Sequence, residues 1–181
     1  MALTATSIAQ ASVIVDVTES NSNVYFQWNG SLDTANSVYH DLYGGWMVGA
    51  VRADYPNFVM QLSSSGNTLS YSLSSIPLQA NFGPGNGGYN DLTSLSGNGT
   101  FAFDKHQIGV GQFYTSGSPI TGAAYIQNQT IVGLGFKSGT FTWTLAGSGD
   151  TVVMTVVPEP STYAMIGAGA LGLLAMRRRR A

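Results

Sequence analysis

The sequence predicts an all-β body of the β-sandwich or jelly-roll type, followed by a single C-terminal hydrophobic helix that crosses a membrane. Short segments in which apolar and polar residues alternate, separated by turns rich in Gly, Asn and Ser, predict the body over residues 12–156. An uncharged apolar run over residues 162–176 predicts the helix. No segment of the body shows a convincing helical period.

Ten segments of the body carry the strand pattern. In chain order they span residues 12–18, 24–28, 46–55, 58–62, 68–74, 100–103, 108–114, 130–136, 140–145 and 151–157. Asn29-Gly30 after the second segment and Gly66-Asn67 before the fifth are predicted turns. Because side chains alternate between the two faces of a strand, the pattern also predicts which of them point inward. These are Val13, Val15, Phe26, Trp28, Leu69, Tyr71, Leu73, Phe141, Trp143 and Leu145.

The composition fits one exported domain with a short appendage. The chain has 181 residues, of which 44% are hydrophobic, so it can bury a core. Only 9% are charged, against roughly 25% in an average soluble domain. The body holds eight acidic and three basic side chains, and this acidic balance argues against nucleic-acid binding. The chain has no cysteine, which excludes disulfides, thiolate zinc sites and cysteine nucleophiles.

Residues 1–11 are interpreted as the remnant of a signal peptide. Ala9-Gln10-Ala11 has the small-x-small pattern of a cleavage site, so the mature protein is expected to begin at or near Ser12. No basic segment precedes this site, and the apolar stretch before it is short and rich in Thr, which indicates that the front half is missing. The alternative is an ordinary N-terminal extension.

Three features follow one another in the tail, residues 157–181. They are the helix-incompatible segment Pro158, Glu159 and Pro160, the apolar run 162–176, and the basic cluster Arg177, Arg178, Arg179 and Arg180. The run spans about 23 Å as a helix, and snorkelling arginines make up part of the difference from the roughly 30 Å hydrocarbon core. Positive side chains beside an apolar helix stay cytoplasmic, which puts the body on the other side of the membrane. The alternative for the arginines is a nucleic-acid or phosphate patch.

This order of Pro-Glu-Pro, a Gly/Ala/Leu-rich apolar run and a terminal arginine cluster resembles the PEP-CTERM sorting signal of Gram-negative bacteria. The resemblance implies an exported protein that an exosortase recognises and cuts near the Pro-Glu-Pro motif. It also implies a link to biofilm or exopolysaccharide, and the same tail closes some proteins described as ice-binding. The body is similar to exported PEP-CTERM proteins of unassigned function in 28–33, 113–117 and 139–145, which implies export and a β fold.

The resemblance gives expectations for location and partners. The chain is expected to pass through a single-pass inner-membrane intermediate with its body outside the cytoplasm, and then to reach the cell surface or the medium. The expected partners are an exosortase-type processing enzyme, the membrane through the C-terminal helix, and exopolysaccharide.

The leading functional hypothesis is a non-enzymatic surface or matrix protein, and the alternative is a carbohydrate- or ice-binding module. Aromatic rings that could stack on sugars are Trp28, Trp46, Trp143, Tyr43 and Tyr89, although the alternation of Trp28 and Trp143 favours the core. Tyr89 and Asp91, in the Gly-rich loop 81–96, are the predicted ligand-binding residues. Asn86, Asn90 and Asp91 could hold calcium, but one carboxylate favours a simple turn. Thr140, Thr142 and Thr144 share one strand face, as an ice-binding row or a solvated face.

The second alternative is a secreted hydrolase. Asp33, Asp91 and Asp104 could be paired by the fold, and His40-Asp41 and 104–106 are the clusters of ionisable residues. Neighbouring residues on a strand point to opposite faces, so neither cluster offers a ready dyad. A G-x-S-x-G elbow is absent. The G-x-G-x-x-G match at 167–172 has no acid after it, so no dinucleotide cofactor is expected, and no metal site is expected.

Overall fold

The computed structural model describes residues 11–43, 49–54, 57–62, 67–77, 88–98 and 100–158, and every regular element in these ranges is a β-strand. The strands are β1 (Ser12–Ser20), β2 (Asn23–Gly30), β3 (Tyr39–Tyr43), β4 (Ala50–Asp54), β5 (Asn57–Leu62), β6 (Thr68–Ser75), β7 (Asn90–Asp91), β8 (Ser94–Asn98), β9 (Phe101–Asp104), β10 (Gln107–Gly111), β11 (Ile120–Gln127), β12 (Gly139–Leu145) and β13 (Thr151–Val157). The prediction of an all-β body is therefore confirmed. Within the described ranges no helix is both long and apolar enough to span a bilayer, and the predicted helix at 162–176 lies outside them.

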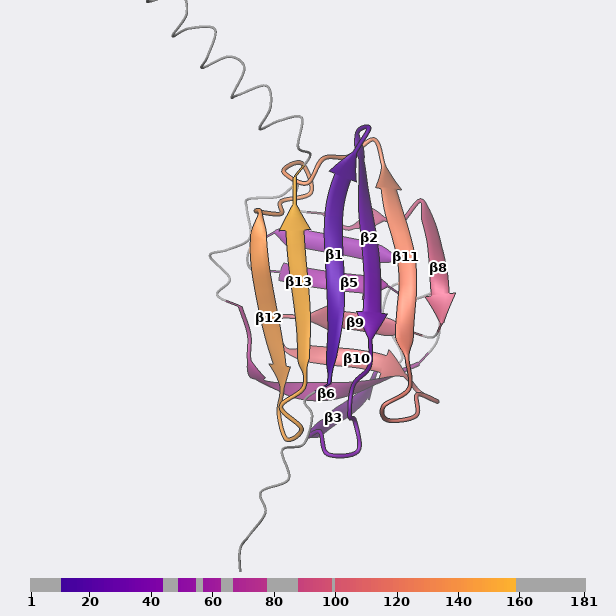
Figure 1. Ribbon diagram of the computed structural model, residues 1–181, viewed down its shortest axis with the longest axis vertical. Helices are drawn as coiled ribbons and strands as arrows, with labels where there is room; N and C mark the ends of the chain where they lie inside the picture. Colours follow the sequence, from indigo (N-terminus) through magenta and orange to yellow (C-terminus); the bar gives the residue numbers. More distant parts are fainter. Residues whose placement is uncertain are drawn as a thin grey trace, which may run out of the picture.

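The strands form one sheet that curls into two facing layers. Its order is β7-β4-β5-β9-β10-β6-β12-β13-β1-β2-β11-β8, with β3 paired to β6. We call β12, β13, β1, β2, β11 and β8 layer A, and the remaining strands layer B. Figure 1 shows the strands of layer A side by side, with β5, β9, β10 and β6 of layer B running across behind them. Strand β6 joins the layers, because it pairs with β10 on one side and β12 on the other.

The first and last strands of the body lie next to each other in layer A. β1 pairs in parallel with β13, from Ser12 opposite Thr151 to Thr18 opposite Val157. β1 then turns into β2 at Asn21-Ser22, whose positive φ angles of 52° and 58° suit a tight two-residue hairpin. The chain therefore leaves β13 at the end of layer A that carries this hairpin turn. We call this end of the body the tail end. The opposite end, where β1 and β13 begin, is called the far end.

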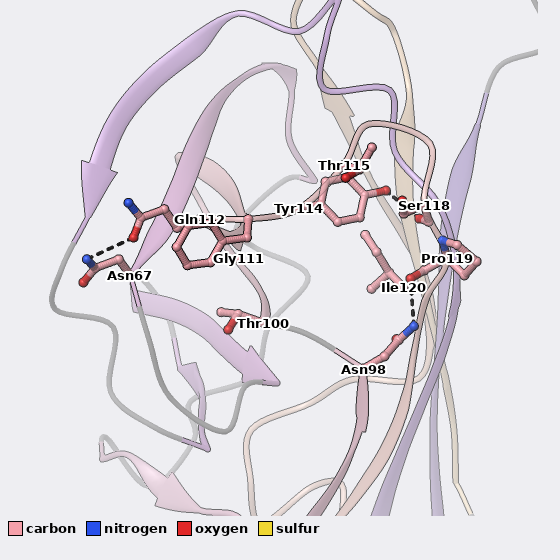
Figure 2. Close-up of a pocket in the computed structure, with 11 residues that line it drawn as sticks. Asn67, Asn98, Thr100, Gly111, Gln112, Tyr114, Thr115, Ser118, Pro119 and Ile120 are labelled. Atoms are coloured by element: carbon pink, nitrogen blue, oxygen red, sulfur yellow. Dashed lines mark hydrogen bonds between the residues drawn. The ribbon is translucent and has the colours of Figure 1, made fainter.

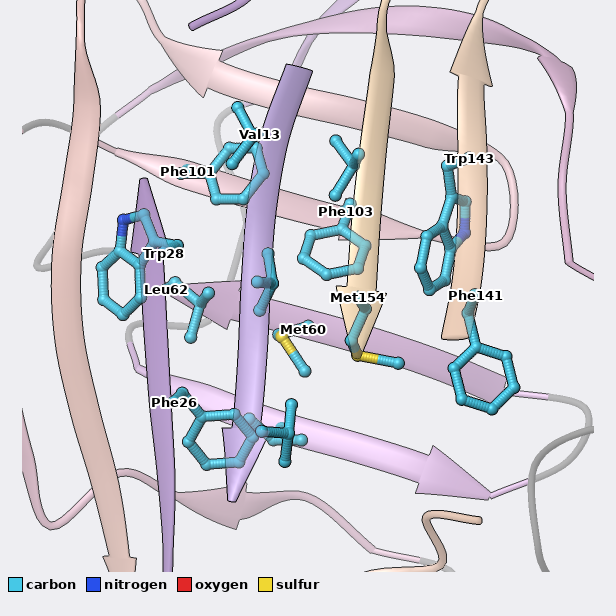
Figure 3. Close-up of a cluster of buried hydrophobic side chains, with 14 of the residues drawn as sticks. Val13, Phe26, Trp28, Met60, Leu62, Phe101, Phe103, Phe141, Trp143 and Met154 are labelled. Atoms are coloured by element: carbon cyan, nitrogen blue, oxygen red, sulfur yellow. The ribbon is translucent and has the colours of Figure 1, made fainter. Parts of the chain in front are cut away.

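The core fills the space between the two layers. Layer A contributes Val13, Phe26 and Trp28, and layer B contributes Met60, Leu62, Phe101 and Phe103 (Figure 3). These side chains are at most 4% exposed. The inward positions predicted in β1, β2 and β12 are confirmed as buried.

In β6 the prediction holds only in part. Tyr71 is buried, whereas Leu69 and Leu73 are half-buried and pack against the edge of the core. Thr68 and Ser70 on the opposite face are fully buried. Because β6 is the strand at which the sheet passes from one layer to the other, both of its faces are covered near Ser70, and strict alternation fails there.

The strand predicted over residues 130–136 is wrong, because these residues form turns. The hydroxyl of Thr130 accepts the Gly133 N–H at 2.9 Å, and the Leu134 N–H donates to the Thr130 carbonyl at 3.0 Å. This side-chain cap satisfies the backbone locally and competes with strand pairing. Ile131, Leu134 and Phe136 of this segment are nonetheless buried, whereas Val132 is exposed. The Phe136 ring packs 6.2 Å from that of Phe26.

Strand β11 was not predicted, and its composition explains why. Its middle, Gly122-Ala123-Ala124, is low in β propensity. Gly122 lies opposite Trp28, and a Cβ atom on Gly122 would collide with the Trp28 indole and lie 2.5 Å from the Ser96 carbonyl oxygen. Gly122 thus weakens the strand pattern in the sequence and makes room for the Trp28 indole in the structure. The predicted turn at Asn29-Gly30 is also wrong, since both residues belong to β2.

Candidate functional site

The leading candidate site is a hollow of about 490 Å³ at the far end of the body (Figure 2). Its lining combines amides, hydroxyls and aromatic rings, and none of the described residues that line it is charged. These residues are Asn67, Asn98, Thr100, Gly111, Gln112, Phe113, Tyr114, Thr115, Ser118, Pro119 and Ile120. They come from the residues just before β6 and β9, the ends of β8 and β10, the connection from β10 to β11, and the start of β11.

A tight turn after β10 presents Phe113 to solvent. The Tyr114 N–H donates to the Gly111 carbonyl at 2.8 Å, which places Gln112 and Phe113 at the corner. The Gln112 N–H also donates to the Asn67 carbonyl at 3.0 Å. Phe113 is 92% exposed, the most of any large apolar side chain in the described ranges. Its backbone is thus held by ordered hydrogen bonds while its ring stays in water.

The next residue, Tyr114, anchors this turn to the body. Its phenol oxygen accepts the Leu32 N–H at 3.1 Å and donates to the Ser118 carbonyl at 2.7 Å. Burial raises the pKa of Tyr114, so the phenol stays protonated and remains a donor. Gly117, whose φ is 79°, allows the chain to turn back between Tyr114 and β11.

Three amide side chains, those of Asn67, Gln112 and Asn98, place hydrogen-bonding groups in the wall of the hollow. The Asn67 amide donates to the Gln112 side-chain oxygen at 3.3 Å (Figure 2). The Asn98 amide donates to the Pro119 carbonyl at 3.0 Å, and its oxygen accepts the Thr121 N–H at 2.6 Å. Each primary amide has two N–H donors and two acceptor lone pairs, so these bonds orient the groups without exhausting them. The wall suits a ligand that offers many hydroxyl groups.

A network of two carboxylates supports the loops beside the hollow. The Asp33 side chain accepts from the Ser116 hydroxyl at 2.8 Å and from the Asn36 amide at 2.6 Å. Buried Asp150 accepts the Ala11 N–H at 2.9 Å and the Asp33 N–H. These bonds join the loop after β2, the turn before β11 and the β12–β13 hairpin. The hydrogen bonds from Asn36 and Ser116 lower the pKa of Asp33.

We expect Asp33→Asn to reduce the acid sensitivity of the fold. A carboxylate whose pKa is lowered by folding contributes stability above its ordinary value, roughly pH 4, and loses it as the pH falls through the lower folded value. Asp104 acts in the opposite sense, because burial raises its pKa. Denaturant melts between pH 2 and pH 7 should show a shallower acid loss in Asp33→Asn and a steeper one in the control Asp104→Asn. Equal acid slopes in the parent and Asp33→Asn would contradict this assignment.

The predicted ligand-binding residues lie away from the hollow, at the edge of layer B. Tyr89 is 44% exposed, but the Arg52 guanidinium lies 5.5 Å from its ring centre and covers one face. Asp91 forms part of β7 and pairs with Ala50. The Asn90 amide donates to the Val51 and Gly88 carbonyls, and Asn86 lies outside the described residues. The part of the chain that the structure describes holds no group of three His, Cys, Asp or Glu side chains around a common point.

The three acids considered for hydrolysis are held in separate places. Asp91 on β7 and Asp104 on β9 are separated by two strands, hence by about 14 Å at the usual strand spacing. The Asp104 carboxylate accepts the N–H groups of His106 and Gln107 and closes the β9–β10 turn. The Asp33 N–H donates a hydrogen bond to the carboxylate of Asp150, on the β12–β13 hairpin. His40 and Asp41 lie at a bulge in β3.

The remaining aromatic and threonine positions divide between core and surface. Trp28 and Trp143 are buried, as their alternation indicated, and Trp46 lies outside the described residues. Tyr43 ends β3. Thr140, Thr142 and Thr144 face outward on layer A beside Thr155, Val153 and Thr151 of β13, so the row has one matching neighbour strand.

Two of the predicted processing residues fall in the described part of the chain. Pro158 directly follows β13 at the tail end. Ala11 is tied to the body, because its carbonyl accepts the Thr151 N–H at 3.2 Å and its own N–H donates to Asp150. Ala9, Glu159, Pro160 and the four arginines at 177–180 lie outside the described residues.

The site residue that sequence reasoning missed is Phe113. It stood at the end of a predicted strand over 108–114, where it is out of phase with the buried residues Ile108 and Val110. Strict alternation would have put its ring on the outer face, so the signal was present. Its amide neighbours Asn67 and Asn98 come from distant segments, and no local pattern announces them.

Comparison with known proteins assigns the tail. Searches of curated proteins and of solved structures found no match to the chain. Residues 156–180 match the family model of the PEP-CTERM protein-sorting motif, in agreement with the resemblance of Pro158-Glu159-Pro160 and the segment after it. The chain therefore carries a PEP-CTERM sorting motif, which implies an exported protein that an exosortase sorts through a membrane-associated intermediate.

Proposed function

We propose that the chain is a non-enzymatic surface or matrix protein whose β body binds a neutral polysaccharide in the hollow beside Phe113. The observation that carries this proposal is the position of Phe113, a 92% exposed ring on an ordered turn at the rim of an amide-lined hollow whose described lining is uncharged. Ligand sites in proteins are commonly concave, and their lining combines aromatic rings with a small number of placed polar groups.

The chemistry of the hollow matches that of a sugar. One face of a pyranose ring carries C–H groups, whose positive edges are attracted to the negative face of an aromatic ring such as Phe113. The hydroxyl groups around the sugar both donate and accept, as do the amides of Asn67, Asn98 and Gln112. Because the described lining has no charge, it offers no counter-charge to an anionic polymer.

The position of the hollow supports binding outside the cell. Ile120, in its wall, starts β11 at the far end of layer A, whereas the sorting motif begins at Val156, at the tail end. While a single membrane helix at 162–176 holds the protein, the hollow faces away from the bilayer. After processing by the exosortase, the body is released to the cell surface or the medium and can join a polysaccharide matrix.

We expect Phe113→Ala to weaken binding to soluble neutral glucans by about three- to tenfold, because one aromatic contact contributes about 0.5–1.5 kcal/mol beyond the area it buries. Affinity electrophoresis in gels containing dextran or a β-glucan measures this change, with alginate as the anionic comparison. Phe113→Tyr, which keeps the ring face, is the matched control and should bind like the parent. Since the ring is exposed, the melting temperature should not change. Parent-like retardation of Phe113→Ala would refute the site.

A hydrolase would give a different result in the same material. It would release new reducing ends from the glucan during incubation, and a binding module would leave their concentration constant. The ice-binding alternative has its own support in the Thr row of β12, which lies beside Thr151, Val153 and Thr155 of β13. It predicts thermal hysteresis that Thr142→Lys abolishes. The polysaccharide proposal predicts no thermal hysteresis.

A further inference from the structure

We infer that the bound polysaccharide continues from the hollow onto the outer face of layer A and runs along β2 and β11 to Tyr25 and Tyr125. This inference rests on the proposed function and extends it from a single pocket to an extended site. It makes the ligand a chain of several sugar units rather than a single sugar.

A second depression, of about 570 Å³, lies on this outer face beside the hollow. Asp16, Gln27, Asn29 and Thr121 line it from three neighbouring strands. The strand register places Asn29 opposite Thr121 and Gln27 opposite both Asp16 and Ala123. One row across β1, β2 and β11 thus holds Ile14, Asn29 and Thr121. The next row holds Asp16, Gln27 and Ala123, whose small side chain leaves the centre of the track low.

Asn98 and Thr121 connect the two depressions. Asn98 lines the hollow, and its side-chain oxygen accepts both the N–H and the hydroxyl of Thr121, at 2.6 and 3.1 Å. Thr121 in turn lines the depression on the outer face. A ligand that fills the hollow beside Asn98 and Thr121 can therefore continue onto the outer face of layer A without crossing a buried segment.

A pair of tyrosines closes the track at the tail end. Tyr25 and Tyr125 are direct partners on β2 and β11, with ring centres 5.8 Å apart and planes inclined by 32°. Both are half-exposed on the outer face. From Tyr125 to Thr121 the strand advances four residues, or about 13 Å, which leaves space for a short run of sugars between the tyrosines and the hollow.

The chemistry of the track fits a neutral chain of sugars. None of the outward-facing residues on β1, β2, β8 and β11, all of them described, is Lys or Arg. Asp16 is an acceptor for hydroxyl groups and repels anionic polymers. The track also offers the amides of Gln27 and Asn29, the Thr121 hydroxyl and the two tyrosine rings.

A length series of neutral oligosaccharides tests the inference on the full chain in mild detergent. Isothermal titration should show the affinity of the parent rising with length until the ligand spans from the hollow to the tyrosines. In Tyr125→Ser the long oligosaccharides should bind about three- to tenfold more weakly, while the shortest bind as in the parent. Phe113→Ala should weaken binding at every length. Tyr89→Ser, an exposed tyrosine on the other layer, is the matched control and should match the parent.

The possible results distinguish the extended track on layer A from the proposed binding in the hollow. If the parent binds all lengths equally, or if Tyr125→Ser binds long ligands as the parent does, the track is overturned while the hollow stands. Equal weakening in Tyr89→Ser would also overturn it. If the parent binds no neutral oligosaccharide, the proposed function fails as well. If Tyr125→Ser instead abolishes a dimer in sedimentation velocity, the face is a contact between copies of the chain, and the track is again overturned.

Discussion

Trp143→Ala is expected to lower the free energy of unfolding by about 3–5 kcal/mol, the range for removing a large aromatic side chain from a core. Trp143 is fully buried in β12, and its ring meets that of Phe103 edge to face at 4.8 Å. Phe103 belongs to layer B, so this contact holds the two layers together. Urea denaturation followed by circular dichroism measures the change.

The adjacent residue supplies the control. Thr142 faces solvent on the same strand, and Thr142→Ala should change the free energy of unfolding by less than about 0.5 kcal/mol. A loss of under about 1 kcal/mol in Trp143→Ala would mean that the layers are not packed around this ring. The two substitutions together test the register of β12, since a one-residue shift would exchange their effects.

Replacement of Pro158, Glu159 and Pro160 by alanine is expected to abolish processing while leaving the body folded. The sorting motif covers residues 156–180, and Pro158 directly follows β13, the last strand of the body. Replacement of the four arginines at 177–180 by serine should disturb retention instead. On insertion scales each arginine costs roughly 2.5–3.5 kcal/mol at the bilayer centre, so we expect the cluster to hold its end of the predicted helix in the cytoplasm.

Fractionation in a host that carries the sorting enzyme measures both effects. The parent should appear in the cleaved form, the alanine variant should remain at full mass in the membrane, and the serine variant should change its distribution. Thermal melts of the variants should match that of the parent. Release of both variants with the parental cleaved mass and yield would contradict the role of the tail.

Alternation predicted the parts of the fold in which one face of a strand is buried and the other is wet. β1, β2, β12 and β13 follow this rule, and Phe26, Trp28 and Trp143 are buried as predicted. The rule fails where other constraints dominate. β11 was not predicted because Gly122, which makes room for Trp28, has a low β propensity. Residues 130–136 contain the apolar residues of a strand pattern but form a capped turn. The joining of the layers through β6 depends on pairings between distant segments, which no local pattern encodes.

The candidate site was predicted less well than the fold. Sequence reasoning favoured Tyr89 and Asp91 because they lie in a Gly-rich loop, and the structure places them at the edge of layer B beside Arg52. The hollow instead assembles Asn67 before β6, Asn98 at the end of β8 and Phe113 in the connection from β10 to β11. Each is an ordinary surface residue by itself, and only their juxtaposition in space suggests a function. By contrast, the tail is a contiguous motif, and the match over residues 156–180 confirms the sorting signal that the sequence indicated.

Nuclear magnetic resonance tests directly whether the hollow beside Phe113 binds a neutral polysaccharide. The experiment titrates a neutral glucan onto the full chain, which is held in detergent micelles. Backbone amide signals of residues 111–115, Asn67 and Asn98 should shift in a saturable way on titration, because these residues form the hollow and its rim. Alginate should cause no such shifts. A saturable glucan effect confined to Tyr89, Asp91 and their neighbours, or no saturable effect anywhere, would contradict the assignment of the hollow as the polysaccharide site.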